Sequence, residues 1–175
     1  NYGEARRINA GSPEPLWTGG FNTELSWRGI SLGIQLEARY GNKVLNQDRS
    51  LFEADGSYGD SNIWKGAMNY WKKPGDTNVL PKPVYNNSSN SSAISTRYLE
   101  DGSYLRIKDI TLAYSLPSKW TKKALMSGVR IYASALNLYT FHNMNYWDPE
   151  HGTSGATIIS YPMTRSMIVG VDITF

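Results

Sequence analysis

Apolar and polar residues alternate along several segments of the chain. In residues 30–40 every second position is apolar, and the positions between them are polar, charged or glycine. A period of two is typical of a β-strand with one apolar face. The segment is also long enough to cross a bilayer, because a tilted membrane strand needs about 9–11 residues. Its apolar positions are Ile30, Leu32, Ile34, Leu36, Ala38 and Tyr40.

Four further segments show related patterns, which makes five predicted strands. In the third segment the apolar positions change parity near Lys108 and Asp109. We expect a β-bulge there, because one extra residue restores a common face. The fourth segment alternates less clearly, since both of its parities are partly apolar. The predicted strands cover residues 17–27, 30–40, 103–116, 129–140 and 163–175.

The last predicted strand keeps one apolar face up to its final residue, Phe175. Soluble domains usually fray at their ends. In an outer-membrane β-barrel, by contrast, the final strand must be fully paired to close the wall, and aromatic residues form girdles at both interfaces. We therefore expect Phe175 to lie in such a girdle and to take part in barrel closure.

The connections between the predicted strands differ greatly in length. Only Arg28 and Gly29 join the first strand to the second, and about a dozen residues join the third to the fourth. The other connections are much longer, and short turns on one rim with long loops on the other are typical of outer-membrane barrels. We expect the long stretches to be extracellular. These stretches are 1–16, 41–102 and 141–162.

Composition narrows the function classes further. The formal net charge of +3 is too small and too scattered to favour nucleic-acid binding. The absence of cysteine excludes disulfides and thiolate metal sites. Both histidines, His142 and His151, lie in one predicted loop, and no Ser-His-Asp or paired-acid arrangement is recognisable. The sequence therefore predicts no enzyme, no metal site and no cofactor site.

Five strands cannot close a barrel, because even the smallest bacterial barrels need about eight. An open sheet with two bare edges would aggregate or pair with another chain. The predicted fold class is therefore all-β. We expect the last five antiparallel strands of a large transmembrane β-barrel, with long extracellular loops and one short loop helix, so that the chain is the C-terminal part of a larger protein.

Four segments in the second half of the chain occur in an order and spacing that resemble a known family. They are residues 102–117 (GSYLRIKDITLAYSLP), residues 129–140 (VRIYASALNLYT), residues 147–150 (WDPE), and Tyr161-Pro162 together with Phe175. Together they resemble the end of SusC/RagA-type TonB-dependent outer-membrane receptors (Bacteroidetes-like). Residues 17–40 fit this family more loosely, as generic barrel strands.

The resemblance implies a barrel of about 22 strands, the size of plugged transporters. It implies TonB-driven import of glycan oligomers or peptides across the outer membrane of a Gram-negative cell, with a SusD-like surface lipoprotein as a lid. The implied partners are the N-terminal remainder of the barrel with its plug, the TonB complex, reached through that upstream region, and outer-membrane lipid. In barrels of this class a terminal aromatic such as Phe175 is also expected to act as an assembly signal.

Two other readings remain open from the residues alone. A passive outer-membrane porin would have the same strands without a plug. A plug domain upstream would distinguish an importer from such a porin. A soluble β-sandwich that binds carbohydrate would also show alternating strands and exposed aromatic residues. The sequence does not name the cargo, because loop residues select it.

Residues 61–73 carry apolar side chains at helical spacing, at Ile63, Ala67, Tyr70 and Trp71. Ser61 is placed to cap such a helix, and Pro74-Gly75 would end it. The aromatic residues of this helix either stack on cargo or pack the loop onto the rim of the barrel, and packing is the expected role. The candidates for contact with cargo or a partner protein are Trp64, Tyr70 and Trp71.

A second aromatic group follows the fourth predicted strand, and its candidates for contact are Tyr146 and Trp147. Girdle or loop packing is the alternative role. Asp148 and Glu150 flank Pro149 and offer oxygen ligands for a cation, although a structural role in the loop is favoured. A set of polar residues is expected on the lumen side, in salt bridges with plug or wall. They are Glu24, Gln35, Glu37, Arg39, Arg106 and Lys108.

Overall fold

The computed structural model describes residues 2–58, 62–150, 155–157, 161 and 163–175. The chain divides into two compact units, which we describe one at a time. The sheet unit comprises residues 15–41, 102–149 and 161–175, and the loop unit comprises residues 1–14, 42–101 and 150–160. Among the described residues, no helix is both long and apolar enough to span a membrane.

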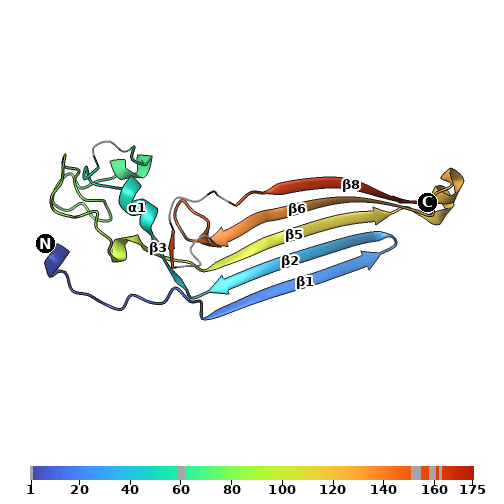
Figure 1. Ribbon diagram of the computed structural model, residues 1–175, viewed down its shortest axis with the longest axis horizontal. Coiled ribbons are helices and arrows are strands. Elements are labelled where there is room, and N and C mark those ends of the chain that lie inside the picture. Colours follow the sequence, from blue (N-terminus) through green and yellow to red (C-terminus); the bar gives the residue numbers. More distant parts are fainter. Residues whose placement is uncertain (1, 59–61, 151–154, 158–160, 162) are drawn as a thin grey trace. The chain divides into compact units, whose positions relative to one another are not determined.

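The sheet unit is a single five-stranded antiparallel sheet in the order β1-β2-β5-β6-β8 (Figure 1). Every strand therefore pairs with the next long strand along the chain, as in a meander. This is the antiparallel arrangement expected from the alternating segments. The strands are β1 Trp17–Trp27, β2 Ile30–Tyr40, β5 Tyr104–Ser115, β6 Gly128–His142 and β8 Ser166–Thr174.

Short connections join the strands at one end of this sheet. Arg28 and Gly29 both have positive φ angles, 48° and 87°, as a two-residue hairpin turn with the right twist requires. The connection from β5 to β6 contains the helical turns α2 (Ser118–Thr121) and η4 (Lys122–Ala124). The backbone N–H of Ser115, the last residue of β5, donates to the Gly29 carbonyl at 2.8 Å. This hydrogen bond links the hairpin turn to the start of the connection between β5 and β6.

The register collects most apolar side chains of the five strands on one face, which we call the apolar face. Its residues pair side by side, for example Leu25 with Leu32 and Ile131 with Val171. Many of these side chains are exposed, including Trp27 at 67% and Met167 at 81%. The exposed large members are Trp17, Phe21, Leu25, Trp27, Ile30, Tyr40, Leu105, Leu112, Tyr114, Ile131, Tyr139, Phe141, Met167, Val169, Val171 and Ile173.

The predicted β-bulge in β5 is confirmed. Gln35 pairs with Asp109, whereas its neighbour Leu36 pairs with Ile107, so Lys108 is an extra residue in β5. The extra residue shifts the alternation by one position. The apolar side chains on both sides of the bulge therefore face the same way.

A second irregularity lies beside this bulge, in β6. Leu136 and Tyr139 pair with residues of β5 that are only two apart, which leaves Asn137 and Leu138 opposite a single residue. Asn137 has a φ of 51°, a left-handed conformation that asparagine tolerates better than most residues. The bulge explains the weak periodicity of the fourth predicted strand, because the ladder is interrupted in its middle.

The last strand is shorter than predicted. Residues 163–175 were expected to be extended throughout, but β8 covers only Ser166–Thr174. Its pairing stops at Leu136, where the bulge in β6 begins, and the side-chain amide of Asn137 donates to the Thr164 carbonyl at 3.2 Å instead. Phe175 follows β8 and is 87% exposed.

The loop unit contains a small sheet that the sequence did not predict. β3 (Lys43–Asn46) pairs antiparallel with β4 (Leu99–Asp101) and parallel with β7 (Ala156–Thr157). The alternation of such short strands is too brief to recognise in a sequence. The described residues of this unit also form four helical turns. They are η1 Tyr2–Glu4, α1 Gln47–Phe52, η2 Lys65–Met68 and η3 Thr96–Tyr98.

The predicted loop helix over residues 61–73 is wrong in extent. Only Lys65–Met68 is helical, as one 3-10 turn, and Tyr70 forms a β-bridge with Leu80 instead. The proposed cap, Ser61, lies outside the described residues. The α-helix of this unit is α1, where the side chain of Asn46 accepts a hydrogen bond from the Arg49 N–H and so caps the first turn.

Candidate functional site

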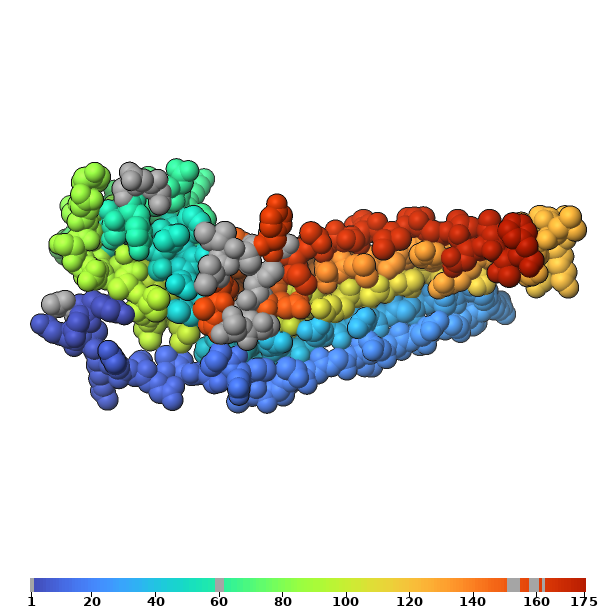
Figure 2. Space-filling model, viewed as in Figure 1, coloured from blue at the N-terminus to red at the C-terminus, as the bar shows by residue number. Residues whose placement is uncertain are grey.

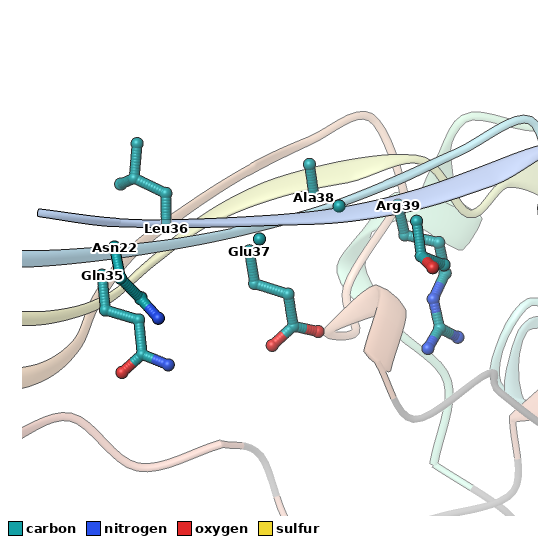
Figure 3. A pocket seen from close by; sticks show the side chains of 9 residues that line it. Asn22, Gln35, Leu36, Glu37, Ala38 and Arg39 are labelled. Carbon is teal, nitrogen blue, oxygen red and sulfur yellow. The ribbon is translucent and has the colours of Figure 1, made fainter.

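The face opposite the apolar face, which we call the polar face, carries the charged and amide side chains of the sheet. Figure 3 shows the division on β2, where Leu36 and Ala38 point to one side while Glu37 and Arg39 point to the other. Side chains from β1 and β2 line a shallow recess of about 460 Å³ here. The alternation thus separates two chemically different surfaces on one layer of backbone.

Glu37 is at the centre of one cluster on the polar face. Its carboxylate accepts a hydrogen bond from the Tyr104 hydroxyl at 2.7 Å and pairs with the Lys108 ammonium at 3.0 Å. The Arg39 guanidinium lies 5.8 Å from the centre of the Tyr104 ring, and that of Arg106 lies 5.3 Å from it. The bulge makes this cluster, because it turns Lys108 toward the polar face. Residues of the polar face are thus paired with one another across neighbouring strands.

Arg106 holds the connection after β6 against the sheet. Its side chain is fully buried, Nε donates to the Thr140 hydroxyl at 2.8 Å, and Nη2 forms an ion pair with Asp148. A buried guanidinium is costly unless it is paired. The ion pair with Asp148 therefore offsets part of the cost of burying Arg106. The sequence offered Asp148 as a cation ligand but favoured a structural role in the loop, and its ion pair with Arg106 supports that structural role.

A third cluster consists of hydroxyls around one carboxylate. Asp109 accepts hydrogen bonds from Thr111 at 2.7 Å and from Ser134 at 2.9 Å, and the Thr111 hydroxyl also reaches Ser134 at 2.9 Å. The three residues come from β5 and β6 and form a ladder across the polar face. Among the described residues, no group of three or more histidine, aspartate or glutamate side chains is arranged to hold a metal ion.

Tyr146 and Trp147 lie in the connection that Arg106 holds. Together with His142, Thr140 and Arg106 they line a recess of about 280 Å³. Tyr146 is 55% exposed and has a φ of 67°, whereas the indole Nε1 of Trp147 is buried and has no hydrogen-bond partner among the described residues. The two residues therefore differ: the ring of Tyr146 is presented to the outside, and that of Trp147 is partly enclosed.

The other three predicted contact residues belong to the loop unit. Trp64 stacks on Phe52 with ring centres 4.8 Å apart, and the backbone N–H of Trp64 donates to the backbone carbonyl of Phe52. The Lys72 ammonium lies 5.4 Å from the centre of the Tyr70 ring. Trp71 remains 39% exposed. Trp64 thus packs inside its unit, while Trp71 offers the most ring surface of the three.

The interior of the loop unit is polar. Arg49 bonds to the carboxylate of Glu53 at 2.9 Å and to that of Glu100 at 2.6 Å, and both acids are nearly buried. Burial alone would lower the pKa of Arg49, but its hydrogen bonds to Glu53 and Glu100 outweigh burial, so the pKa is raised above its ordinary value. Arg49 stays charged and joins α1 to β4.

Two other groups in the loop unit have shifted pKa values. Burial raises the pKa of the Tyr98 phenol, which is fully buried. Hydrogen bonds from the backbone N–H groups of Lys72 and Lys73, at 2.9 Å and 3.0 Å, lower the pKa of the Asp76 carboxyl. Asp76 thereby holds a turn near the exposed ring of Trp71.

Sequence reasoning placed these charged residues on one face but did not identify their partners. The pairing of Arg106 with Asp148 joins residues that are 42 positions apart, and that of Glu37 with Tyr104 joins residues 67 apart. No local pattern signals such contacts. The alternation in residues 30–40 did place Glu37 and Arg39 on one face, which is the part of this cluster that a sequence can show.

Proteins with similar sequences are known. TonB-dependent receptor P3 of Formosa agariphila is 30% identical over 98% of this chain, and TonB-dependent receptor P26 of the same organism is 27% identical over 94%. The chain spans only 17% of the length of each of these relatives. No profile of a known protein family matches the chain.

Solved structures with a similar fold include those of the RagAB peptide importer. One in a closed-closed state aligns with a TM-score of 0.79 and 30% identity, covering 95% of this chain and 18% of that one. One in an open-open state aligns with a TM-score of 0.79 and 29% identity, covering 97% and 19%. By sequence and fold, the chain matches the C-terminal portion of SusC/RagA-type TonB-dependent receptors. The five-stranded antiparallel sheet matches the barrel portion of RagA, which confirms the predicted all-β barrel class and the outer-membrane location.

Proposed function

We propose that the chain forms the last five strands of a barrel of about 22 strands, and that the whole receptor imports oligomers across the outer membrane in a TonB-dependent manner. The observation that carries this proposal is the sheet unit, with a wide exposed apolar face on one side and paired charges on the other. Such a layer suits a wall between lipid and an aqueous, plugged lumen.

The apolar face bounds the membrane, and the polar face meets the plug and the path of the cargo. The clusters around Glu37 and Arg106 keep Glu37, Lys108 and Arg106 paired, which lowers the desolvation cost when the wall faces a moving plug. The short connections lie on the periplasmic side, and the loop unit lies outside the cell. The partner is a SusD-like lipoprotein that covers the extracellular opening.

Peptides are the favoured cargo, and glycan oligomers are the second candidate. The similarity to the RagAB importer, whose described cargo is peptide, supports the first at 30% identity. Exposed rings at Trp71 and Tyr146 support either, because aromatic faces stack on peptide side chains and on sugars alike. We assign cargo or partner contact to Trp71 and Tyr146, weaker contributions to Trp64, Tyr70 and Trp147, and wall closure to Phe175.

Uptake by the full-length receptor tests the proposal. A strain that lacks the receptor gene is supplied with the intact protein, with or without a functional TonB system, and offered labelled peptides or labelled glycan oligomers of similar size. TonB-dependent uptake of peptides is expected. Uptake of the same peptides without TonB would instead show a passive porin, and TonB-dependent uptake restricted to glycans would replace the cargo assignment.

Single variants then test the aromatic residues. Tyr146→Ala and Trp71→Ala are expected to reduce uptake several-fold at low cargo concentration while leaving receptor levels unchanged, because both rings are exposed and support no buried core. Tyr139→Ala is the matched control, since Tyr139 is similarly exposed, at 48%, but belongs to the apolar face. Equal effects in all three variants would contradict a contact role.

A further inference from the structure

The connection between β5 and β6 has features that the import function does not explain. Residues 117–128 contain three lysines and no acidic residue. Trp120 is 61% exposed and Leu125 is 89% exposed. We call residues 117–128 the basic turn. It projects at the end of the sheet, where Figure 2 shows it in gold, uncovered by the strands.

Leu125 is held in an unfavourable state on two counts. Its φ of 59° lies in the left-handed region, which is costly for a side chain of this type by roughly 1–3 kcal/mol. Its apolar side chain is also left almost entirely uncovered. A glycine or asparagine would fit this backbone better if the turn faced only water. A leucine in this position is favourable only where its side chain enters an apolar phase.

The turn is rigid enough to hold this arrangement. Thr121 is buried, and its carbonyl accepts a hydrogen bond from the Met126 N–H at 3.1 Å. The N–H of Ser127 donates to the Thr174 carbonyl at 2.7 Å, which anchors the end of the turn to the edge strand β8. Trp120 and Leu125 are therefore displayed by a fixed frame, and their exposure is built into the fold.

The apolar face continues to this rim. Trp27, at the end of β1, is 67% exposed and has the Arg28 guanidinium 4.9 Å from its ring centre. The hairpin turn at Arg28 is joined to the end of β5 by the hydrogen bond from Ser115 to Gly29. The indole of Trp27 thus lies beside a cation at the hairpin turn between β1 and β2. The indole of Trp120 lies among lysines in the connection between β5 and β6. This is the arrangement of a membrane interface, where rings sit at headgroup level beside cations.

We propose that the basic turn binds the headgroups of anionic phospholipids in the leaflet next to this rim, with Lys119, Lys122 and Lys123 facing the phosphates and Trp120 and Leu125 inserted beside the acyl chains. The choice of phospholipid rests on the proposed periplasmic position of the short connections. Charge complementarity and continuity with the lipid-facing surface both favour lipid over a soluble partner. The site adds an attachment point at one rim of the barrel.

The test uses the full-length receptor in vesicles of phosphatidylethanolamine, without cargo, so that its outcome is independent of uptake. Spin-labelled phosphatidylglycerol and spin-labelled phosphatidylcholine are compared for association with the protein by electron paramagnetic resonance. The native receptor is expected to prefer phosphatidylglycerol. In the triple variant Lys119→Gln, Lys122→Gln, Lys123→Gln the preference for phosphatidylglycerol is expected to fall by a factor of about ten or more. Each lysine near an anionic surface strengthens binding by a factor of about five.

The matched control removes the same charge elsewhere. Lys65→Gln, Lys72→Gln, Lys73→Gln changes three exposed lysines of the loop unit and is expected to leave the preference unchanged. An equal loss in both triple variants would overturn the proposal, since it would show a general charge effect. An unchanged preference in the variant of the basic turn would overturn it as well.

A second measurement keeps the proposal testable if the triple variant does not fold. A fluorophore on Leu125→Cys is expected to be quenched by lipids carrying a nitroxide at headgroup level and shielded from a water-soluble quencher. The reverse pattern would show that the turn faces water. Shielding that appears only after peptidoglycan or a periplasmic extract is added would assign the turn to a different partner and overturn the lipid site.

Discussion

The sheet unit and the loop unit place their polar and apolar residues in opposite positions. The sheet unit leaves rings and aliphatic side chains exposed over one whole face, and it buries Arg106 completely. The loop unit buries a polar interior around Arg49, Glu53 and Glu100. A wide exposed apolar face is stable only in lipid, whereas paired charges inside a small unit suit a segment surrounded by water. Each unit is thus built for a different solvent.

The largest expected effect comes from breaking the buried ion pair of the sheet unit. Asp148→Asn removes the carboxylate of Asp148 from its ion pair with the buried Arg106 guanidinium, and this is expected to lower the free energy of unfolding by about 3–5 kcal/mol. Denaturant titration of the full-length receptor in vesicles measures the loss. The double variant Arg106→Met, Asp148→Asn is expected to recover most of it.

An exposed ion pair on the same sheet is the control for this prediction. Arg130 and Asp172 lie 3.4 Å apart with side chains 46% and 57% exposed. Removing Asp172 is expected to change the free energy of unfolding by no more than about 1 kcal/mol. Similar losses at Asp148 and Asp172 would show that burial does not distinguish the two pairs.

The second prediction compares the two faces directly at neighbouring positions of β1. Phe21 lies on the apolar face and Asn22 on the polar face, and both are exposed in the sheet unit. Phe21→Arg is expected to cost about 2–4 kcal/mol of folding free energy in a membrane, because a charge near mid-bilayer is costly. Asn22→Arg is expected to cost little. Equal tolerance of arginine at both positions, measured by folding yield into vesicles, would remove the basis for a lipid-facing surface.

A third prediction concerns the interior of the loop unit. Arg49→Met leaves Glu53 and Glu100 without their cation and is expected to destabilise this unit by about 1.5–3 kcal/mol, the range of hydrogen bonds to charged groups. Hydrogen exchange of peptides from residues 43–53 should increase. Exchange in β5 and β6 should stay unchanged, and a matching increase there would show that the two units unfold together.

The smallest effect is expected at the turn held by Asp76. Its pKa is lowered by the N–H groups of Lys72 and Lys73, so its contribution is complete above the ordinary carboxyl pKa of about 3.8 and is lost as the pH falls through the lower folded value. Exchange of these two amides, corrected for the intrinsic rate, should rise only at that lower pH. In Asp76→Asn the corrected rate should not depend on pH, and a persistent acid transition would assign it to another group.

Much of the sheet unit could be predicted from alternation alone. The ranges 17–27 and 30–40 coincide with β1 and β2, and the change of parity at Lys108 showed the bulge. These features depend on neighbours in the sequence. The start of the last strand depends instead on Asn137, which lies in another strand. For that reason the predicted start at residue 163 was too early.

The loop unit was much harder to predict. Helical spacing at Ala67, Tyr70 and Trp71 suggested a helix, but the pairing of Tyr70 with Leu80 replaces it. Its small sheet joins strands that are more than 50 residues apart in sequence, as Lys43 with Asp101 shows. The candidate contact residues were chosen by residue type, and only their exposure in the structure separates Trp71 and Tyr146 from the partly buried Trp64 and Trp147.

The two bulges lie at the same level, since Lys108 in β5 sits opposite Asn137 and Leu138 in β6. The two bulges therefore form one line of irregular pairing across β5 and β6. This line separates the regular register on the side of the short connections from the regular register on the other side. An insertion or deletion in the halves of these strands away from the short connections can be absorbed at the bulges. The side chains of the other halves then stay on their original faces. The strand ends beyond the bulges can therefore change in length while the pairing on the side of the short connections keeps its register.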